Sequence, residues 1–269
     1  MIELHCHTTC SDGTLTPTEL VRAAAQAGVK ALAITDHDTL SGWDEACQAA
    51  SVYGLELIPG VELSTVLNGR SLHILGFYPQ CGQLQAALQE RIAGRVRRAH
   101  KMIEQLAALG YPLTMPKMPP NMAPGRPHIA KAMLDAGYVT STQEAFERFL
   151  GDDKPAYVHY EKFDSADGIA LLRTCGAVPV WAHPYLFRGG KVEDVLPELV
   201  AAGLMGIEVY HPEHRPSQSD RLKRLCEEYG LIMTGGSDYH GPAPGDRSEA
   251  SSLNCLNVPS NSHFETFIL

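Results

Sequence analysis

Short apolar runs alternate with amphipathic stretches over roughly the first 80 residues of the chain. Helical patterns separate the runs: the first begins with the capping box Thr16-Pro17-Thr18-Glu19, and the second covers about 41–53, with Gly54 expected to end it. The apolar runs have the length of buried strands. We predict strands at 2–5, 30–35, 55–63 and 72–78.

The pattern changes after Pro79. One long helix is predicted at 83–109, then a loop rich in proline and methionine at 111–127, and two shorter helices near 128–137 and 142–150. No convincing strand pattern occurs between 80 and 155. We therefore expect a helical insertion domain at 81–154 that caps the active site of a discontinuous catalytic domain, 1–80 and 155–269.

Strand and helix patterns alternate again after the insertion. Strands are predicted at 177–182, 205–210 and 231–234, with helices near 165–175, 191–202 and 216–229. This alternation on both sides of an insertion indicates an α/β protein with parallel strands. Seven strands with chemical groups near their carboxyl ends favour a closed barrel over an open sheet.

Histidines and carboxylates follow most of the predicted strands at the point where each strand stops. His5 and His7 lie two apart on an extended segment, so both imidazoles face one side while Cys6 faces the other. Structural residues would be scattered over both ends of the strands, whereas barrels carry their active sites at the carboxyl ends. The candidates at or near these ends are His5, His7, Asp12, His37, Glu62, His73, His183, Asp238 and His240, and Glu208 precedes His211 and His214 at the sixth.

Two of these candidates have a structural interpretation when taken singly. Asp12 lies in the tight turn Ser11-Asp12-Gly13, where aspartate is common. His73 is flanked by Leu72 and Ile74, as a buried core histidine would be. As a set, however, imidazole and carboxylate ligands without thiolates suit Mn, Zn or Fe, and there are enough of them for two or three ions.

A cluster of divalent ions suits the cleavage of phosphate esters. Ions roughly 3.5–4 Å apart can share a hydroxide, lower its pKa and hold the phosphoryl oxygens. Glu62, at the end of the third predicted strand, would suit a bridging position between two ions. The sequence therefore predicts a metal-dependent phosphoesterase.

Composition narrows the substrates and the location. The net charge of −9 argues against binding long nucleic acid, which normally needs a basic face, but not against a small phosphorylated substrate beside bound cations. The seven cysteines are scattered and never spaced as CxxC, so we expect no disulfide framework and a reducing, cytoplasmic location. No apolar run approaches the ~18 residues of a membrane span, and no signal peptide is expected before His5.

The ordered motifs resemble the PHP (polymerase and histidinol phosphatase) family from residue 1 to about 245. They are His5-Cys6-His7-Thr8, Ser11-Asp12-Gly13, Thr35-Asp36-His37-Asp38, Gly60-Val61-Glu62, His73, Ala182-His183-Pro184 and Ser237-Asp238-Tyr239-His240. The resemblance implies a distorted (β/α)7 barrel with a trinuclear site, commonly of Mn²⁺, although Zn²⁺, Fe²⁺ or Mg²⁺ would also suit. By motif, one ion would be held by His5, His7, Glu62 and Asp238, a second by Glu62, His73 and His183, and a third by Asp12, His37 and His240.

The insertion resembles the branch of that family that contains 3′,5′-nucleoside bisphosphate phosphatases and enzymes that trim short RNAs from the 5′ end. The motif Gly125-Arg126-Pro127-His128 is typical of this branch. A second phosphate needs cationic contacts away from the metals, and arginine can bind it with two hydrogen bonds. The alternative interpretation of Arg126 is a solvated residue at a helix start. For the charges of the long helix the alternative is a solvated face, made of Arg95, Arg98 and Lys101.

The function expected from these observations is hydrolysis of the 3′-phosphate of adenosine 3′,5′-bisphosphate or a similar nucleotide. A metal-bound hydroxide would attack phosphorus in line. The alternatives are 5′→3′ exoribonuclease action on short 5′-phosphorylated RNA and a non-catalytic PHP interaction module; histidinol phosphatase does not need the insertion. Expected helpers in catalysis are Glu62, His211 and His214, and expected substrate contacts are Arg126, His128, Arg98 and Arg215.

Overall fold

The computed structural model describes residues 2–118, 122–159, 163–242, 253 and 255–256. The chain divides into two compact units, one of Met1–Gln85 with Phe163–Leu269 and one of Ala86–Lys162. These boundaries lie at 85/86 and 162/163, against the 80/81 and 154/155 predicted from the sequence. That the inserted unit caps the active site stays a prediction.

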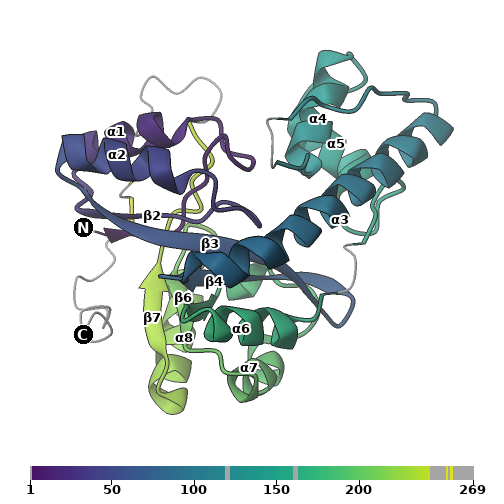
Figure 1. Cartoon of the computed structure of the whole chain (residues 1–269). Coiled ribbons are helices and arrows are strands. Elements are labelled where there is room, and N and C mark those ends of the chain that lie inside the picture. The colour runs from purple at the N-terminus through teal and green to yellow at the C-terminus, as the bar shows by residue number, and fades with distance from the viewer. Residues whose placement is uncertain (1, 119–121, 160–162, 243–252, 254, 257–269) are drawn as a thin grey trace. The chain divides into compact units, whose positions relative to one another are not determined.

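The first unit is built on a sheet of seven strands that pair in chain order. It is an α/β, nearly closed barrel, and the predicted fold class is confirmed (Figure 1). The first and last strands are joined by the hydrogen bond from Leu4 N–H to Gly235 O, 3.3 Å, and by a parallel bridge between Cys6 and Tyr239. The strands are β1 (Ile2–Glu3), β2 (Ala31–Ile34), β3 (Glu56–Leu67), β4 (Arg70–Phe77), β5 (Val178–Trp181), β6 (Gly206–Tyr210) and β7 (Ile232–Gly235).

The prediction that all strands run parallel is wrong at β4. This strand is antiparallel to both β3 and β5, whereas the other neighbours are parallel. β3 and β4 form a hairpin in which Leu67 pairs with Arg70, and both residues of its turn, Asn68 and Gly69, have positive φ. Asn-Gly is the strongest short hairpin signal because a type I′ turn needs left-handed backbone at both positions. The signal lies in the sequence, and the strand prediction missed it.

The hairpin also changes the end of the third strand. β3 continues for five residues beyond Glu62, to Leu67, so the prediction that Glu62 lies where this strand stops is wrong. The reversal of β4 has a useful consequence: its early residue His73 pairs with Ser64 of β3 and accepts a hydrogen bond from Ala182 N–H, 3.1 Å, just after β5. His73 therefore lies at the same end of the barrel as the residues that follow the parallel strands.

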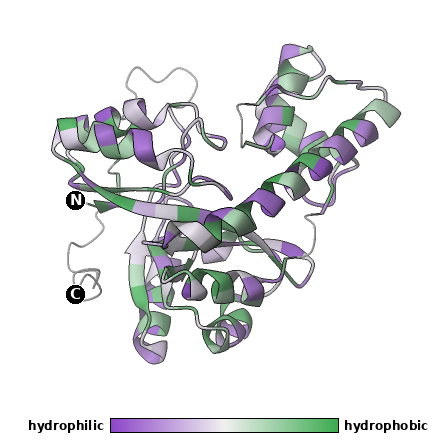
Figure 2. Ribbon diagram, in the orientation of Figure 1, coloured by the Kyte–Doolittle hydropathy of each residue, from purple (hydrophilic) through white to green (hydrophobic). Residues whose placement is uncertain are grey.

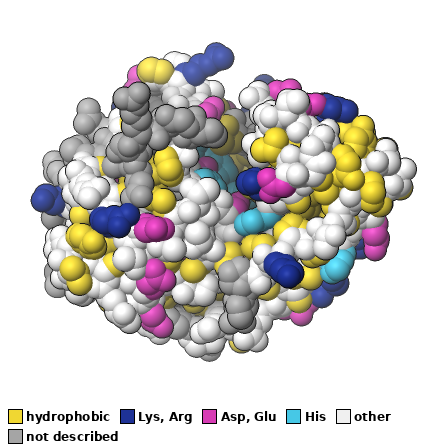
Figure 3. All heavy atoms as spheres, turned by 90° about the horizontal axis from the view of Figure 1, so that it is seen from above, with side chains coloured by type: hydrophobic (Ala, Val, Ile, Leu, Met, Phe, Trp, Pro, Cys, Tyr) yellow, Lys and Arg dark blue, Asp and Glu magenta, His cyan; other side chains and the backbone are white. Residues whose placement is uncertain are grey.

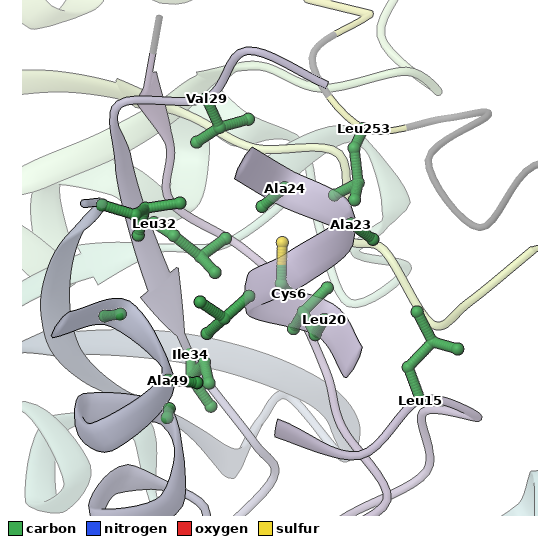
Figure 4. Close-up of a cluster of buried hydrophobic side chains, with 14 of the residues drawn as sticks. Cys6, Leu15, Leu20, Ala23, Ala24, Val29, Leu32, Ile34, Ala49 and Leu253 are labelled. Atoms are coloured by element: carbon green, nitrogen blue, oxygen red, sulfur yellow. The ribbon is translucent and has the colours of Figure 1, made fainter. Parts of the chain in front are cut away.

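Amphipathic helices cover the barrel (Figure 2). The predicted capping box is confirmed at the start of α1, where Thr16 and Glu19 satisfy each other's backbone N–H groups, and Gly54 ends α2 in the left-handed conformation. Cys6 packs with Leu20 and Leu32 in the apolar cluster beneath α1, so it does point away from the histidines that flank it (Figure 4). The helices of this unit are α1 (Pro17–Gln26), α2 (Trp43–Tyr53), α6 (Ser165–Thr174), η2 (Pro184–Leu186), α7 (Val192–Ala201) and α8 (Pro216–Tyr229).

The second unit is helical, with a core of its own. Met102, Ile129 and Phe149 are among the buried residues that pack together in it. Its helices are most of α3 (Cys81–Ala108), which begins in the first unit, then α4 (Arg126–Asp135), α5 (Thr142–Ala145) and the π-helix η1 (Phe146–Leu150). None of the described helices, not even the 28-residue α3, combines the length and apolar character of a membrane span.

Candidate metal centre on the barrel rim

Glu62 is the centre of the candidate site. It is only 1% exposed, and its two carboxylate oxygens face different histidines. Oε2 lies 3.3 Å from His5 Nε2, 3.2 Å from His7 Nε2 and 3.2 Å from His37 Nδ1. Oε1 lies 2.8 Å from His73 Nδ1 and 3.2 Å from His183 Nε2. One carboxylate thus contacts side chains that follow or belong to four different strands.

The other two carboxylates complete the cluster. Asp238 Oδ1 lies 3.3 Å from His5 Nε2 and 3.1 Å from His7 Nε2. Asp12 Oδ1 lies 3.3 Å from His240 Nε2 and 3.7 Å from His7 Nδ1. The structure brings all nine expected metal ligands together, and histidine and carboxylate side chains lie side by side in the space-filling view (Figure 3).

Three groups of side chains within this cluster have ligand atoms that all lie within 4.8 Å of one another. The first matches the set expected from the motifs. The second contains His37, Glu62 and His73. His183 lies beside this group, because it contacts Glu62 Oε1, the oxygen that His73 also contacts. The third contains His7 besides the three expected residues. The groups are His5, His7, Glu62 and Asp238; His37, Glu62 and His73; and His7, Asp12, His37 and His240.

Buried atoms of the cluster fit divalent cations. His5 Nε2, Asp12 Oδ1 and Glu62 Oε2 are buried, and none has a hydrogen-bond partner among the residues that the structure describes. Buried polar atoms are normally satisfied, so His5 Nε2 and Glu62 Oε2, which face each other at 3.3 Å, lack what would pair them. Ions bound between the imidazole nitrogens and carboxylate oxygens would satisfy them, and the absence of thiolates suits Mn, Zn or Fe.

The charges of the cluster shift its pKa values in opposite directions. Burial disfavours ionised Glu62, but the positive charges of His37, His73 and His5 hold its pKa well below the usual range. Burial likewise disfavours protonated His7, but the adjacent carboxylates of Asp238 and Glu62 outweigh it and raise the pKa of His7 to about 10. A metal ion would have to displace a proton from His7, so its affinity should fall as the pH falls.

Strained backbone occurs at the rim. Asp38, His183 and Asp238 have φ values of 53°, 33° and 52°, in the left-handed region that side chains rarely occupy. Such conformations persist where surrounding contacts impose them, and they cluster at functional sites. Here the contacts include the hydrogen bond from Ser64 N–H to Asp38 Oδ1, 3.0 Å, which ties the segment after β2 to β3.

Asp36 holds the segment that carries Asp12. Its carboxylate accepts hydrogen bonds from Thr8 N–H at 2.7 Å, from the Thr8 hydroxyl at 2.7 Å and from the Ser11 hydroxyl at 2.6 Å. Asp36 is 1% exposed and lies outside the three groups of potential ligands. The sequence prediction assigned it no role, although a carboxylate that ends a buried strand requires hydrogen-bond donors.

His211 and His214 also lie at this rim. His211 Nδ1 accepts a hydrogen bond from Glu213 N–H, 3.1 Å, so its ring proton is on Nε2, 3.7 Å from Asp238 Oδ2. His214 Nδ1 donates to Val209 O, 3.2 Å, and burial lowers the pKa of His214. Both rings are buried. Arg215, the third candidate here, is exposed and directly precedes α8, where its backbone N–H donates to Gln218 Oε1 at 2.7 Å.

The expected substrate contacts of the second unit have protein partners within it. Arg126 donates to Asp152 Oδ1 at 3.0 Å, and Arg98 Nε donates to Val158 O at 2.6 Å. Both guanidinium groups lie 5.6 Å from the ring centre of Tyr157. Arg95 and Arg98 are 8% and 4% exposed, so the alternative of a solvated face is wrong for these two residues, whereas Lys101 is exposed.

His128 acts locally at the start of α4. Its Nδ1 accepts a hydrogen bond from Gly125 N–H, 3.0 Å, in the way that a capping side chain does. Helix α4 begins at Arg126, two residues before the predicted start, because Pro127 suits a first turn whose N–H groups need no helical partner.

Comparison with known proteins identifies one family model that matches this chain and relatives that are similar over most of its length. The PHP domain model matches residues 3–112. A 5′-3′ exoribonuclease of Haemophilus influenzae is 38% identical, over 89% of this chain and 90% of its own length. A 3′,5′-nucleoside bisphosphate phosphatase of Chromobacterium violaceum is 33% identical, over 91% and 89%.

A solved structure agrees with these relatives. The crystal structure of a candidate metal-dependent phosphoesterase of Bifidobacterium adolescentis is 32% identical, covers 94% of this chain and 91% of its own, and has a TM-score of 0.84. The barrel, its rim cluster and these relatives define the protein as a metal-dependent phosphoesterase, a hydrolase of phosphate esters. The chain belongs to the PHP family. This assignment as an enzyme sets aside the alternative of a non-catalytic module.

Proposed function

We propose that the protein removes the 3′-phosphate of nucleoside 3′,5′-bisphosphates, such as adenosine 3′,5′-bisphosphate, and releases the 5′-monophosphate and phosphate. The observation that carries this proposal is the contact of both Glu62 oxygens with separate histidine sets, which suits a carboxylate shared between ions. The relative from Chromobacterium violaceum has the corresponding name, and the net charge of −9 favours a small substrate over long nucleic acid.

The proposed metal ligands are the three motif sets. When bound there, divalent ions, commonly Mn²⁺ in this family, with Zn²⁺, Fe²⁺ and Mg²⁺ as alternatives, would supply Lewis-acid activation of water and of the phosphoryl group. Glu62 is the proposed shared ligand. His211, whose Nε2–H faces Asp238, is the proposed contact to the leaving oxygen, with His214 behind it at a ring-centre distance of 5.2 Å. A cytoplasmic location follows only from the sequence and stays a prediction.

Action on short RNA is the second candidate, because the relative from Haemophilus influenzae is named a 5′-3′ exoribonuclease. The scissile bonds are alike, since each is a 3′ phosphoester of a nucleotide that carries a 5′-phosphate. Both candidate substrates therefore require the same rim chemistry. The two substrates differ at the scissile phosphate. It is a terminal monoester in the bisphosphate, whereas in RNA it is also bonded to the next nucleotide.

A direct competition separates the two candidates. With Mn²⁺ present, we expect kcat/KM for adenosine 3′,5′-bisphosphate to exceed that for a 5′-phosphorylated RNA trimer by at least about tenfold, or ~1.4 kcal/mol of transition-state free energy. Steady-state phosphate release and chromatography of the nucleotides would measure both. Faster cleavage of the trimer would make the exoribonuclease the better candidate, and hydrolysis of neither would refute the proposal.

Arg126 is the proposed contact to the phosphate that is not cleaved. A charge-assisted hydrogen bond to phosphate is worth about 1.5–3 kcal/mol, so Arg126→Ala should raise KM for the bisphosphate by roughly 10–100-fold. KM for adenosine 3′-monophosphate, which lacks the 5′-phosphate, should stay unchanged in the same variant.

Asp152→Asn is the matched control, because it removes the ion pair with Arg126 and keeps the guanidinium. We expect it to leave KM for the bisphosphate near the wild-type value. Equal effects of the two variants on both substrates would mean that the ion pair matters only for the fold of the helical unit.

A further inference from the structure

Glu208 is a buried carboxylate at the rim that belongs to none of the three potential ligand groups. It lies in β6 and is fully buried. Its two oxygens have different donors: Oε1 accepts from His5 Nδ1 at 3.0 Å, and Oε2 accepts from the backbone N–H of His183 at 2.8 Å. A buried carboxylate costs free energy unless such bonds satisfy it, so these contacts account for its presence between apolar neighbours.

The bond to His5 decides which nitrogen of that ring can bind a metal. A carboxylate accepts but does not donate, so the proton of His5 lies on Nδ1. The lone pair of Nε2 is then directed at the rim, where Nε2 is 3.3 Å from Glu62 Oε2 and 3.3 Å from Asp238 Oδ1. Hydrogen bonds of this kind orient metal-binding histidines in general.

The bond to His183 acts on the backbone instead. His183 has a φ of 33°, which is strained for a residue with a side chain, and its N–H donates to Glu208 Oε2. In this conformation the side chain of His183 reaches Glu62 Oε1 through Nε2, at 3.2 Å. Glu208 thus holds two histidines that contact opposite oxygens of Glu62.

We propose that Glu208 is a positioning residue that couples two of the metal positions, through the tautomer of His5 on one side and the backbone of His183 on the other. The inference rests on the proposed metal ligands. Only a carboxylate can do both, because both partners are donors. A glutamine at this position has one acceptor oxygen and an NH₂ group, so it would leave one donor facing another or force the proton of His5 onto Nε2.

The test is Mn²⁺ binding by Glu208→Gln, measured by calorimetric titration and by metal analysis after gel filtration. We expect Mn²⁺ affinity to fall by about 10–100-fold, the usual cost of losing such a supporting hydrogen bond. Glu227→Gln, on the exposed side of α8, is the matched control and should bind as the wild type does. Circular dichroism of the metal-free proteins would confirm that both variants fold.

The outcomes separate this inference from the proposed function. A wild-type protein that binds no divalent ion would refute the metal site itself. Wild-type affinity in Glu208→Gln would overturn the role of Glu208 and leave the site standing. Where Glu208→Gln does not fold, nitrogen NMR of the Zn²⁺-loaded wild type decides: His5 should carry its proton on Nδ1 and the metal on Nε2, and the reverse assignment overturns the inference.

Discussion

Glu62→Gln is expected to lower kcat/KM by on the order of 10³-fold, about 4 kcal/mol of transition-state stabilisation. The amide has the shape of the carboxylate but no charge, and only one of its two ends can face a cation. Because both oxygens of Glu62 contact histidines of the cluster, the variant should also bind fewer Mn²⁺ ions per chain. Metal analysis with steady-state kinetics would measure the two effects. Unchanged metal content would refute the shared-ligand role.

His211→Asn serves as the comparison for Glu62→Gln. His211 contacts Asp238 only at 3.7 Å and is absent from the three potential ligand groups. Loss of its ring should therefore lower kcat, by the 10²–10⁴-fold typical of a lost proton-transfer group, and leave Mn²⁺ content unchanged. A variant that lost metal in parallel with activity would show that His211 supports the site rather than the leaving oxygen.

Removal of metal by a chelator is expected to reduce hydrolysis to the background rate, and Mn²⁺ should restore it. The protein itself should stay folded, because its apolar clusters are formed by other residues. Binding to the native state alone stabilises it by RT ln(1 + [L]/Kd), about 2.7 kcal/mol at a hundredfold excess over Kd. Mn²⁺ should therefore raise the thermal midpoint, which differential scanning fluorimetry would measure.

The comparison of cations provides the control for metal removal. Ca²⁺ prefers six to eight oxygen ligands and should rescue little, because most of the candidate ligands here are imidazoles. Full activity in protein shown by elemental analysis to be metal-free would contradict the assignment of the rim cluster to catalysis.

Periodicity and local turn chemistry were readable because they act within a few residues. The capping box of α1 and the left-handed Gly54 involve contacts between near neighbours along the chain, and both predictions are confirmed. The same kind of local signal, Asn68-Gly69, also marked the hairpin between β3 and β4. It was missed because the apolar runs on either side fit an alternating parallel pattern equally well.

The strand direction explains how His73, which taken singly has the interpretation of a core histidine, comes to lie beside the other candidate ligands. In a parallel strand, a histidine near the beginning would lie at the opposite end of the barrel from the other candidates. β4 is antiparallel, so His73 lies at the same rim and contacts Glu62 Oε1 at 2.8 Å. The neighbouring Leu72 and Ile74 indicate a buried strand, but they do not indicate at which end of the barrel this strand begins.

By itself, the sequence determined the barrel class, the helical insertion and the nine residues with ligand chemistry, because hydrophobic periodicity and residue type are local properties. Only the tertiary structure decided how these residues share one centre. That Glu62 contacts five histidines, and that Glu208 holds His5 and His183 from β6, depends on strand pairing across up to 203 positions of sequence separation. Such contacts arise from barrel closure and strand direction, which no short stretch of the chain encodes.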